Sequence, residues 1–182
     1  MWAERVYRRY TCEDALVQTN GFFSLNLRAS AVKSIIGLLD LTCDSVVAWV
    51  GCGDGREVLS IAKEFPSVQF HAFEINADAL RVARRVAASE GVSNVAFHHK
   101  SFVDAPRGAS FTHVYSTALA GQALYARLAE ACTEKLCVLS EMRPCGSPLI
   151  AATTVRLMGS GEQRQLVCVS PSVDDGGRGA VP

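Results

Sequence analysis

Residues 46–58, Val-Val-Ala-Trp-Val-Gly-Cys-Gly-Asp-Gly-Arg-Glu-Val, decide the fold of this 182-residue chain. The continuous apolar run 46–50 predicts a buried parallel strand. Three glycines at alternate positions follow it, and a helical pattern then continues from Glu57 to Phe65, where Pro66 ends it. A strand, a glycine-rich turn and a helix together let a ligand approach backbone N–H groups near a helix N-terminus.

An acidic residue, Glu74, stands about 20 residues further on, at the end of a second predicted strand. A carboxylate in that place can accept hydrogen bonds from both ribose hydroxyls of a nucleotide. A dinucleotide fingerprint that started at Gly51 would need glycine at position 56, but Arg56 occupies it. The third glycine comes one residue early, which gives the pattern G-x-G-x-G.

The remaining chain alternates between helical and strand periodicity, which predicts an α/β fold with a mainly parallel sheet. The change after residue 148 to two strand-like segments predicts a terminal antiparallel hairpin. We expect an N-terminal helical segment over 1–45, one domain over 46–171 and a disordered tail over 172–182. The expected helices cover 28–39, 57–65, 77–90 and 122–133, and the expected strands cover 46–50, 68–75, 95–99, 111–116, 136–140, 149–157 and 165–170.

The glycine loop, the acid and the hairpin resemble those of class I methyltransferases that bind S-adenosylmethionine (SAM). The resemblance implies a Rossmann-like, seven-stranded sheet in which the loop lies against the methionine part of SAM and Glu74 holds the ribose. The loop residues expected to bind the cofactor are Gly51, Cys52, Gly53, Asp54 and Gly55.

Residues 24–141 are similar, within that superfamily, to the disruptor-of-telomeric-silencing group of histone-lysine methyltransferases. Lys100-Ser101-Phe102 stands where that group has Gly-Asp-Phe, and residues 114–119 stand where it has Val-Asn-Asn-Phe-Ala-Phe. The resemblance implies an adenine pocket and a mouth through which the methyl group is delivered. The pocket would be formed by Ile75, Asn76, Ser101 and Phe102, and the mouth by Tyr115 and Ser116 as catalytic candidates.

Three positions depart from the pattern of the group. Trp49 replaces an acid before the loop, Ser101 replaces the acid on the adenine side, and Ser116-Thr117 replaces an asparagine pair. The expected function is SAM-dependent methyl transfer to a protein side chain, with lysine as the acceptor. Two alternatives remain open: an RNA methyltransferase, and a catalytically degenerate SAM-binding or structural subunit.

The composition of the chain limits the classes of partner that it is expected to bind. Equal numbers of basic and acidic residues, 18 each, argue against an autonomous nucleic-acid binder, although arginines 81, 84 and 85 leave an RNA contact open. No apolar run is long enough to span a membrane, and the N-terminus lacks the apolar core of a signal peptide. The seven cysteines have no metal-ligand spacing, and we expect no metal site. Reduced thiols favour an intracellular location, cytoplasmic or nuclear. We expect a protein substrate or partner, and self-association remains open.

Overall fold

The computed structural model describes residues 2–10, 29–118, 122–139, 148–156 and 162–171. Its centre is a seven-stranded sheet in the order β3-β2-β1-β4-β5-β7-β6. Strands β1 to β5 pair in parallel, and β7 runs antiparallel to both β5 and β6. The strands are β1 (Val46–Val50), β2 (Gln69–Glu74), β3 (Val95–His99), β4 (Phe111–Ser116), β5 (Cys132–Leu139), β6 (Leu149–Arg156) and β7 (Gln163–Val169).

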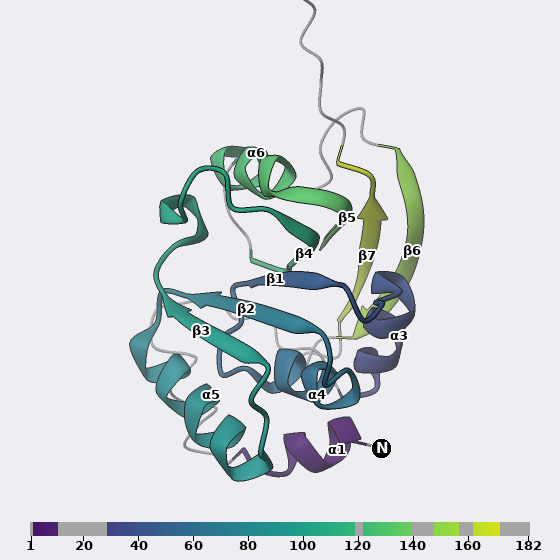
Figure 1. Ribbon diagram of the computed structural model, residues 1–182. Coiled ribbons are helices and arrows are strands. Elements are labelled where there is room, and N and C mark those ends of the chain that lie inside the picture. Colours follow the sequence, from purple (N-terminus) through teal and green to yellow (C-terminus); the bar gives the residue numbers. More distant parts are fainter. Residues whose placement is uncertain (1, 11–28, 119–121, 140–147, 157–161, 172–182) are drawn as a thin grey trace, which may run out of the picture.

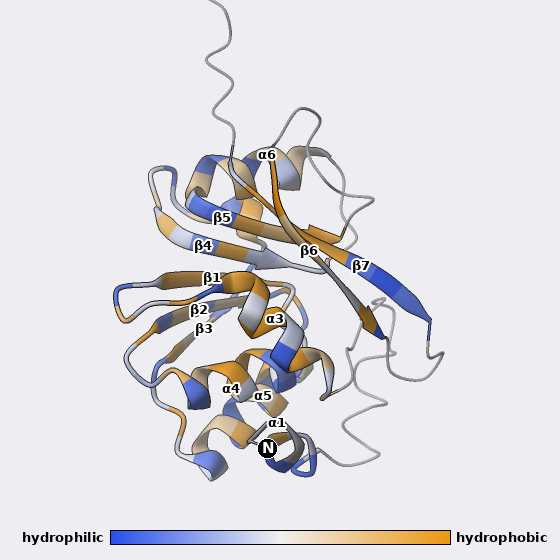
Figure 2. Cartoon of the chain, turned by 90° about the vertical axis from the view of Figure 1, so that its right-hand side faces the viewer, coloured by the Kyte–Doolittle hydropathy of each residue, from blue (hydrophilic) through white to orange (hydrophobic). Residues whose placement is uncertain are grey.

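Helices cover both faces of the sheet, with α3, α4 and α5 on one face and α6 on the other (Figures 1 and 2). The short helix α1 packs outside α4. The helices are α1 (Trp2–Tyr7), α3 (Ala31–Leu39), α4 (Arg56–Glu64), α5 (Ala77–Glu90) and α6 (Gln122–Ala131), and a 3₁₀ turn, η1, spans Phe102–Asp104. This architecture confirms the predicted Rossmann-like fold and its terminal antiparallel hairpin.

Alternation along the strands divides the core between these two faces. In β1, Val47 and Trp49 pack toward α3 and α4, whereas Ala48 and Val50 belong to the cluster that includes α6. Both sets are almost fully buried, as expected for parallel strands covered by helices on both sides. Burial on both faces of the sheet explains why residues 46–50 form a continuous apolar run.

Local signals place the ends of α5. The Asn76 side chain accepts hydrogen bonds from the amides of Asp78 and Ala79, and Gly91 ends the helix with φ +66°. A side-chain cap at the N-terminus and a left-handed glycine at the C-terminus are common ways to satisfy the unpaired backbone groups at helix ends.

The β4–β5 connection differs from the sequence-based expectation. Helix α6 ends at Ala131 rather than at residue 133, and β5 begins at Cys132 instead of residue 136. Cys132 pairs with Phe111 of β4, and the Thr133 hydroxyl donates to the Phe111 carbonyl oxygen. These tertiary contacts extend the strand at the expense of the helix.

The disordered tail expected over 172–182 lies outside the described residues, as do residues 158–161 of the hairpin turn expected over 158–162. In the described part of the chain, no helix is long and apolar enough to cross a membrane. The same part contains no group of three or more His, Cys, Asp or Glu side chains that could hold a metal ion.

Candidate functional site

The candidate site lies at the carboxyl ends of β1, β2 and β4, where the strand order reverses. In open α/β sheets, ligands bind in the crevice at such a switch point. The glycine loop follows β1, Glu74 is the last residue of β2, and Ser116 is the last residue of β4, with residues 117 and 118 directly after it. The fold therefore brings together segments that the sequence separates by more than 60 residues.

Positive φ angles shape the glycine loop. Gly51, Gly53 and Gly55 have φ values of +76°, +56° and +79°, which favour glycine because other residues are strained there. A Cβ added to Gly55 would lie 2.9 Å from the Cβ of Ala83 on α5. The last glycine therefore both turns the chain into α4 and lets α4 and α5 pack closely.

Glu74 ties the end of β2 to this loop. Its Oε2 accepts a hydrogen bond from the Gly53 amide at 2.9 Å, and its Oε1 accepts from the amides of Ile75 and Asn76 at 2.8 and 2.9 Å. The amides of Gly51 and Cys52 donate to the Phe73 carbonyl oxygen. The expected ribose acid is therefore adjacent to the glycine loop and fixed in direction.

Asp54 turns its carboxylate inward. It is 1% exposed and accepts from the Arg56 Nε at 3.0 Å, and the Arg56 Nη2 also contacts Asp54 Oδ2. Asp54 Oδ1 further accepts from the Arg56 amide at 3.2 Å. In this structure the Asp54 side chain stabilises the start of α4, and the residue borders the site through its backbone.

The four residues of the expected adenine pocket lie in two adjacent turns, after β2 and β3. Ile75 is 50% exposed, and the Asn76 side chain caps α5. Ser101 caps the 3₁₀ turn, whereas Phe102 is buried, and its ring makes a T-shaped contact with Phe73 at a centroid distance of 5.0 Å. Ile75 is thus the exposed apolar surface here, and Phe102 supports the turn from below.

The two catalytic candidates point to opposite faces of the sheet. Tyr115 is fully buried on the α3 and α4 side and stacks on Trp49 with ring centroids 3.9 Å apart. Burial raises the pKa of the Tyr115 phenol, and its hydroxyl has no hydrogen-bond partner within the described residues. Ser116 donates to the Val50 carbonyl oxygen and accepts from the Ala118 amide, both at 3.2 Å. The structure therefore does not bring Tyr115 to the mouth beside Ser116.

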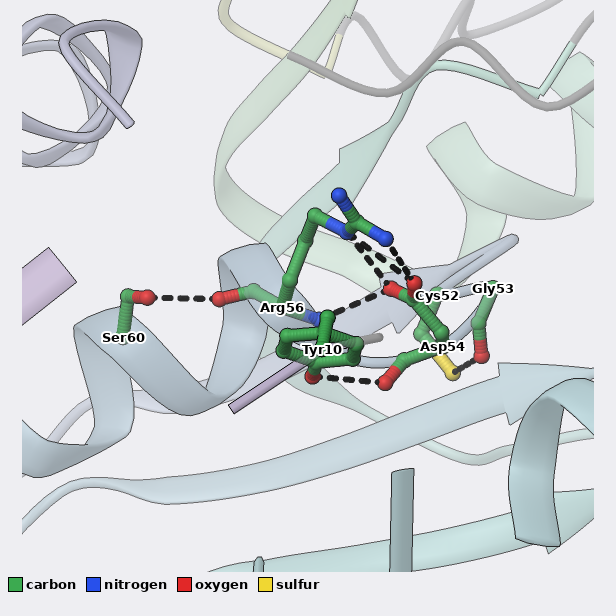
Figure 3. A network of polar contacts seen from close by, with 6 residues as sticks. All are labelled: Tyr10, Cys52, Gly53, Asp54, Arg56 and Ser60. Carbon is green, nitrogen blue, oxygen red and sulfur yellow. Dashed lines mark hydrogen bonds and ion pairs between the residues drawn. The ribbon is translucent and has the colours of Figure 1, made fainter. Parts of the chain in front are cut away.

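Two contributors, Tyr10 and Tyr125, were not expected from the sequence, and a third, Ala118, lies in the segment 114–119 that was expected at the mouth. A Cβ on Gly51 would lie 3.0 Å from the Cβ of Ala118, so the segment after β4 crosses directly beside the loop. The Tyr125 hydroxyl of α6 donates to the Ala118 carbonyl oxygen at 2.8 Å. The Tyr10 hydroxyl, from the N-terminal segment, donates to the Asp54 carbonyl oxygen at 2.8 Å (Figure 3). No local sequence motif marks these contacts, which depend on the tertiary fold.

A family described as methyltransferase domain matches residues 21–151. The chain belongs to this family. It therefore carries a SAM-dependent methyltransferase domain, which confirms the class and the cofactor that the sequence predicted. This family assignment also favours SAM over a dinucleotide as the ligand of the G-x-G-x-G loop.

Two curated relatives match part of the chain. Two release factor glutamine methyltransferases, from two strains of Xylella fastidiosa, are each 29% identical over 113 residues, which cover 56% of this chain and 41% of the relative. This chain therefore matches less than half the length of these relatives.

Solved structures share the fold. TrmN from Thermus thermophilus superposes with a TM-score of 0.64 and 18% identity, over 76% of this chain and 47% of that chain. An RNA methyltransferase from Salinibacter ruber, in complex with S-adenosyl-L-homocysteine, superposes with a TM-score of 0.63 and 22% identity, over 80% of this chain and 94% of that one. At these identities the likeness extends to the fold alone.

Proposed function

We propose that this protein transfers the methyl group of SAM to a nitrogen of a protein side chain, with lysine as the acceptor. The observation that carries the proposal is the convergence of Gly53, Glu74 and Ala118 at the switch point of the sheet. SAM already holds an activated methyl group, so the protein must chiefly align donor and acceptor.

Each part of the site would have a distinct task. The loop from Gly51 to Gly55 would hold the methionine part of SAM, and Glu74 would accept a ribose hydroxyl. Ile75 would cover the adenine, and Asn76, Ser101 and Phe102 would shape the two turns around it. Ser116 would fix the backbone at the mouth through its bonds to Val50 and Ala118, and Tyr115 would support that strand from inside the core.

A protein acceptor is supported by two observations. The formal net charge is zero, whereas nucleic-acid-binding domains usually carry a basic excess. The relatives that act on a release factor also modify a protein. The choice of lysine as the acceptor rests on the resemblance of residues 24–141 to the histone-lysine group. The lysine amine would have to be in its neutral form when it accepts the methyl group.

RNA is the second candidate acceptor because Arg81, Arg84 and Arg85 are all exposed on α5. Arg81 pairs with Asp78 at 3.1 Å, however, and Arg84 contacts the Phe97 carbonyl oxygen at 3.4 Å. The ion pair with Asp78 offsets the charge of Arg81 toward a phosphate backbone, whereas the hydrogen bond of Arg84 only restrains its side chain. An RNA complex would show affinity that falls steeply with salt.

Calorimetric titration with SAM and, separately, with NAD tests the cofactor. To test the acceptor, the protein is incubated with tritium-labelled SAM and cell extract. The labelled products are then digested with either ribonuclease or protease. We expect SAM binding without NAD binding, and label that survives ribonuclease and is recovered as methyl-lysine. Label that survives only protease would establish an RNA acceptor, and SAM binding without any transfer would establish the degenerate module.

A further inference from the structure

Tyr10 reaches from the N-terminal segment to the cofactor loop. Its hydroxyl donates to the Asp54 carbonyl oxygen at 2.8 Å, and the N–H of the same peptide unit, that of Gly55, donates to the Cys52 carbonyl oxygen at 2.9 Å. Both polar groups of this peptide are therefore fixed. It is the peptide that leads into the left-handed conformation of Gly55 and the start of α4.

The Tyr10 ring also covers the buried ion pair of this turn (Figure 3). The Arg56 guanidinium carbon lies 4.6 Å from the ring centroid, and Arg56 is 5% exposed. A cation that is held over an aromatic face and shielded from water is attracted to it more strongly than at an exposed site. Burial raises the pKa of Tyr10, so its hydroxyl remains a donor at physiological pH.

The N-terminal segment is anchored independently of the loop. Val6 of α1 is fully buried in a cluster with Leu59 of α4 and Val86 of α5. Arg9, the residue before Tyr10, donates from Nε to Glu90 Oε1 at 2.5 Å. Tyr10 is thus held in place by contacts that do not involve the glycine loop.

We propose that Tyr10 is a positioning residue for the cofactor: it holds the Asp54–Gly55 peptide in the orientation in which the glycine loop binds SAM. The inference rests on the proposed function of the loop. It makes residues outside the expected domain of 46–171 part of the cofactor site. Coupling between two sites is reciprocal, so bound SAM also stabilises the docked N-terminal segment.

The variant Tyr10→Phe tests this inference because it removes the hydroxyl and keeps the ring over Arg56. Arg9→Gln is the matched control, since Arg9 anchors the same segment without contacting the loop. Two measurements apply to both: calorimetric titration with SAM, and hydrogen exchange of the amides of residues 52–56 without ligand.

We expect Tyr10→Phe to bind SAM about 3- to 10-fold more weakly, as for the loss of one hydrogen bond, and to exchange the loop amides faster. Arg9→Gln should stay within about two-fold of the wild-type SAM affinity, because Val6 still anchors the segment and Lys63 still pairs with Glu90, and should leave the exchange of the loop amides unchanged.

Two outcomes would overturn the inference while leaving the proposed function intact. One is an unchanged SAM affinity in Tyr10→Phe. The other is an equal loss of affinity in both variants, which would mean that docking of the segment in general, rather than the hydroxyl, controls the loop. A wild-type protein that does not bind SAM would overturn the proposed function and this inference together.

Discussion

A hydrogen bond of 2.9 Å joins the Glu74 carboxylate to the Gly53 amide, 21 residues apart in the chain. A carboxylate offers about four lone-pair sites, and three are used by the amides of Gly53, Ile75 and Asn76. Glu74 can therefore accept one ribose hydroxyl while it still holds the loop. A second ribose contact would replace the bond to Gly53, which would couple ribose binding to the position of the loop.

Glu74→Ala should weaken SAM binding by more than about ten-fold, because hydrogen bonds to a charged group contribute about 1.5–3 kcal/mol each. Calorimetric titration measures the affinity, and circular dichroism verifies the fold. Glu64→Ala, which removes an exposed carboxylate at the end of α4, is the control and should bind as the wild type does. Unchanged affinity in a folded Glu74→Ala protein would contradict the placement of the ribose.

Sequence patterns predicted the elements whose signals are local. The bounds of β1, β3, β4 and α5 agree with the expected ranges. A continuous apolar run defines β1, and Asn76 and Gly91 define the ends of α5. Strand β5 begins earlier than expected because its first residues are fixed by contacts with β4.

Only those parts of the candidate site that belong to a sequence motif could be predicted. The glycine loop and Glu74 are recognisable from spacing, and the fold brings them together. Tyr10 was missed because a lone tyrosine, 44 residues from its acceptor, gives no pattern. The direction of Tyr115 also depends on the sheet: its register partner in β1 is Trp49, whose large ring lies on the same face and stacks on it.

Gly55→Ala should lower the melting temperature and destabilise the protein by about 1–3 kcal/mol, the usual cost of a strained backbone. Its added Cβ would meet the Ala83 Cβ at 2.9 Å, in addition to the strain at φ +79°. Gly37→Ala is the opposite case, because Gly37 lies inside α3 and nothing lies within 4 Å of its added Cβ. That variant should stabilise the protein by up to about 1 kcal/mol. Equal effects of the two substitutions would contradict the packing of α4 on α5.

Stability should fall as the pH drops below about 6.5, because burial lowers the pKa of three histidines, His71, His98 and His113, and holds them in their neutral form. His71 Nδ1 and His98 Nε2 lie 3.1 Å apart in a hydrogen bond that needs one unprotonated ring. Desolvation lowers the pKa of both side chains below 6.5, and the nearby His71 and Lys100 lower that of His98 further. Unfolding therefore takes up protons, and the melting temperature should decrease between about pH 7 and 5. His98→Gln should show a smaller decrease, and an equal decrease in this variant would contradict the assignment.

Glu90→Gln should destabilise the protein by about 1–3 kcal/mol, because it removes the charge-assisted hydrogen bonds that Lys63 and Arg9 donate to the carboxylate. The Glu90 side chain is fully buried, and Lys63, Arg9 and Arg5 approach its carboxylate at 2.5, 2.5 and 3.5 Å. It therefore holds α1 and the following turn against α4 and α5.

The hydrogen bond from Lys63 and the other nearby cations lower the pKa of Glu90. Its contribution is therefore present above the unfolded-state pKa of about 4.5 and is lost as the pH falls through the folded-state value. Chemical denaturation at pH 7 and at about pH 3 should show a difference between Glu90→Gln and wild type that shrinks in acid. Glu130→Gln, which disrupts the pair between the exposed Glu130 carboxylate and Arg127, should cost less than about 1 kcal/mol. A Glu90→Gln protein no less stable than Glu130→Gln would show that the buried carboxylate does not anchor the N-terminal segment.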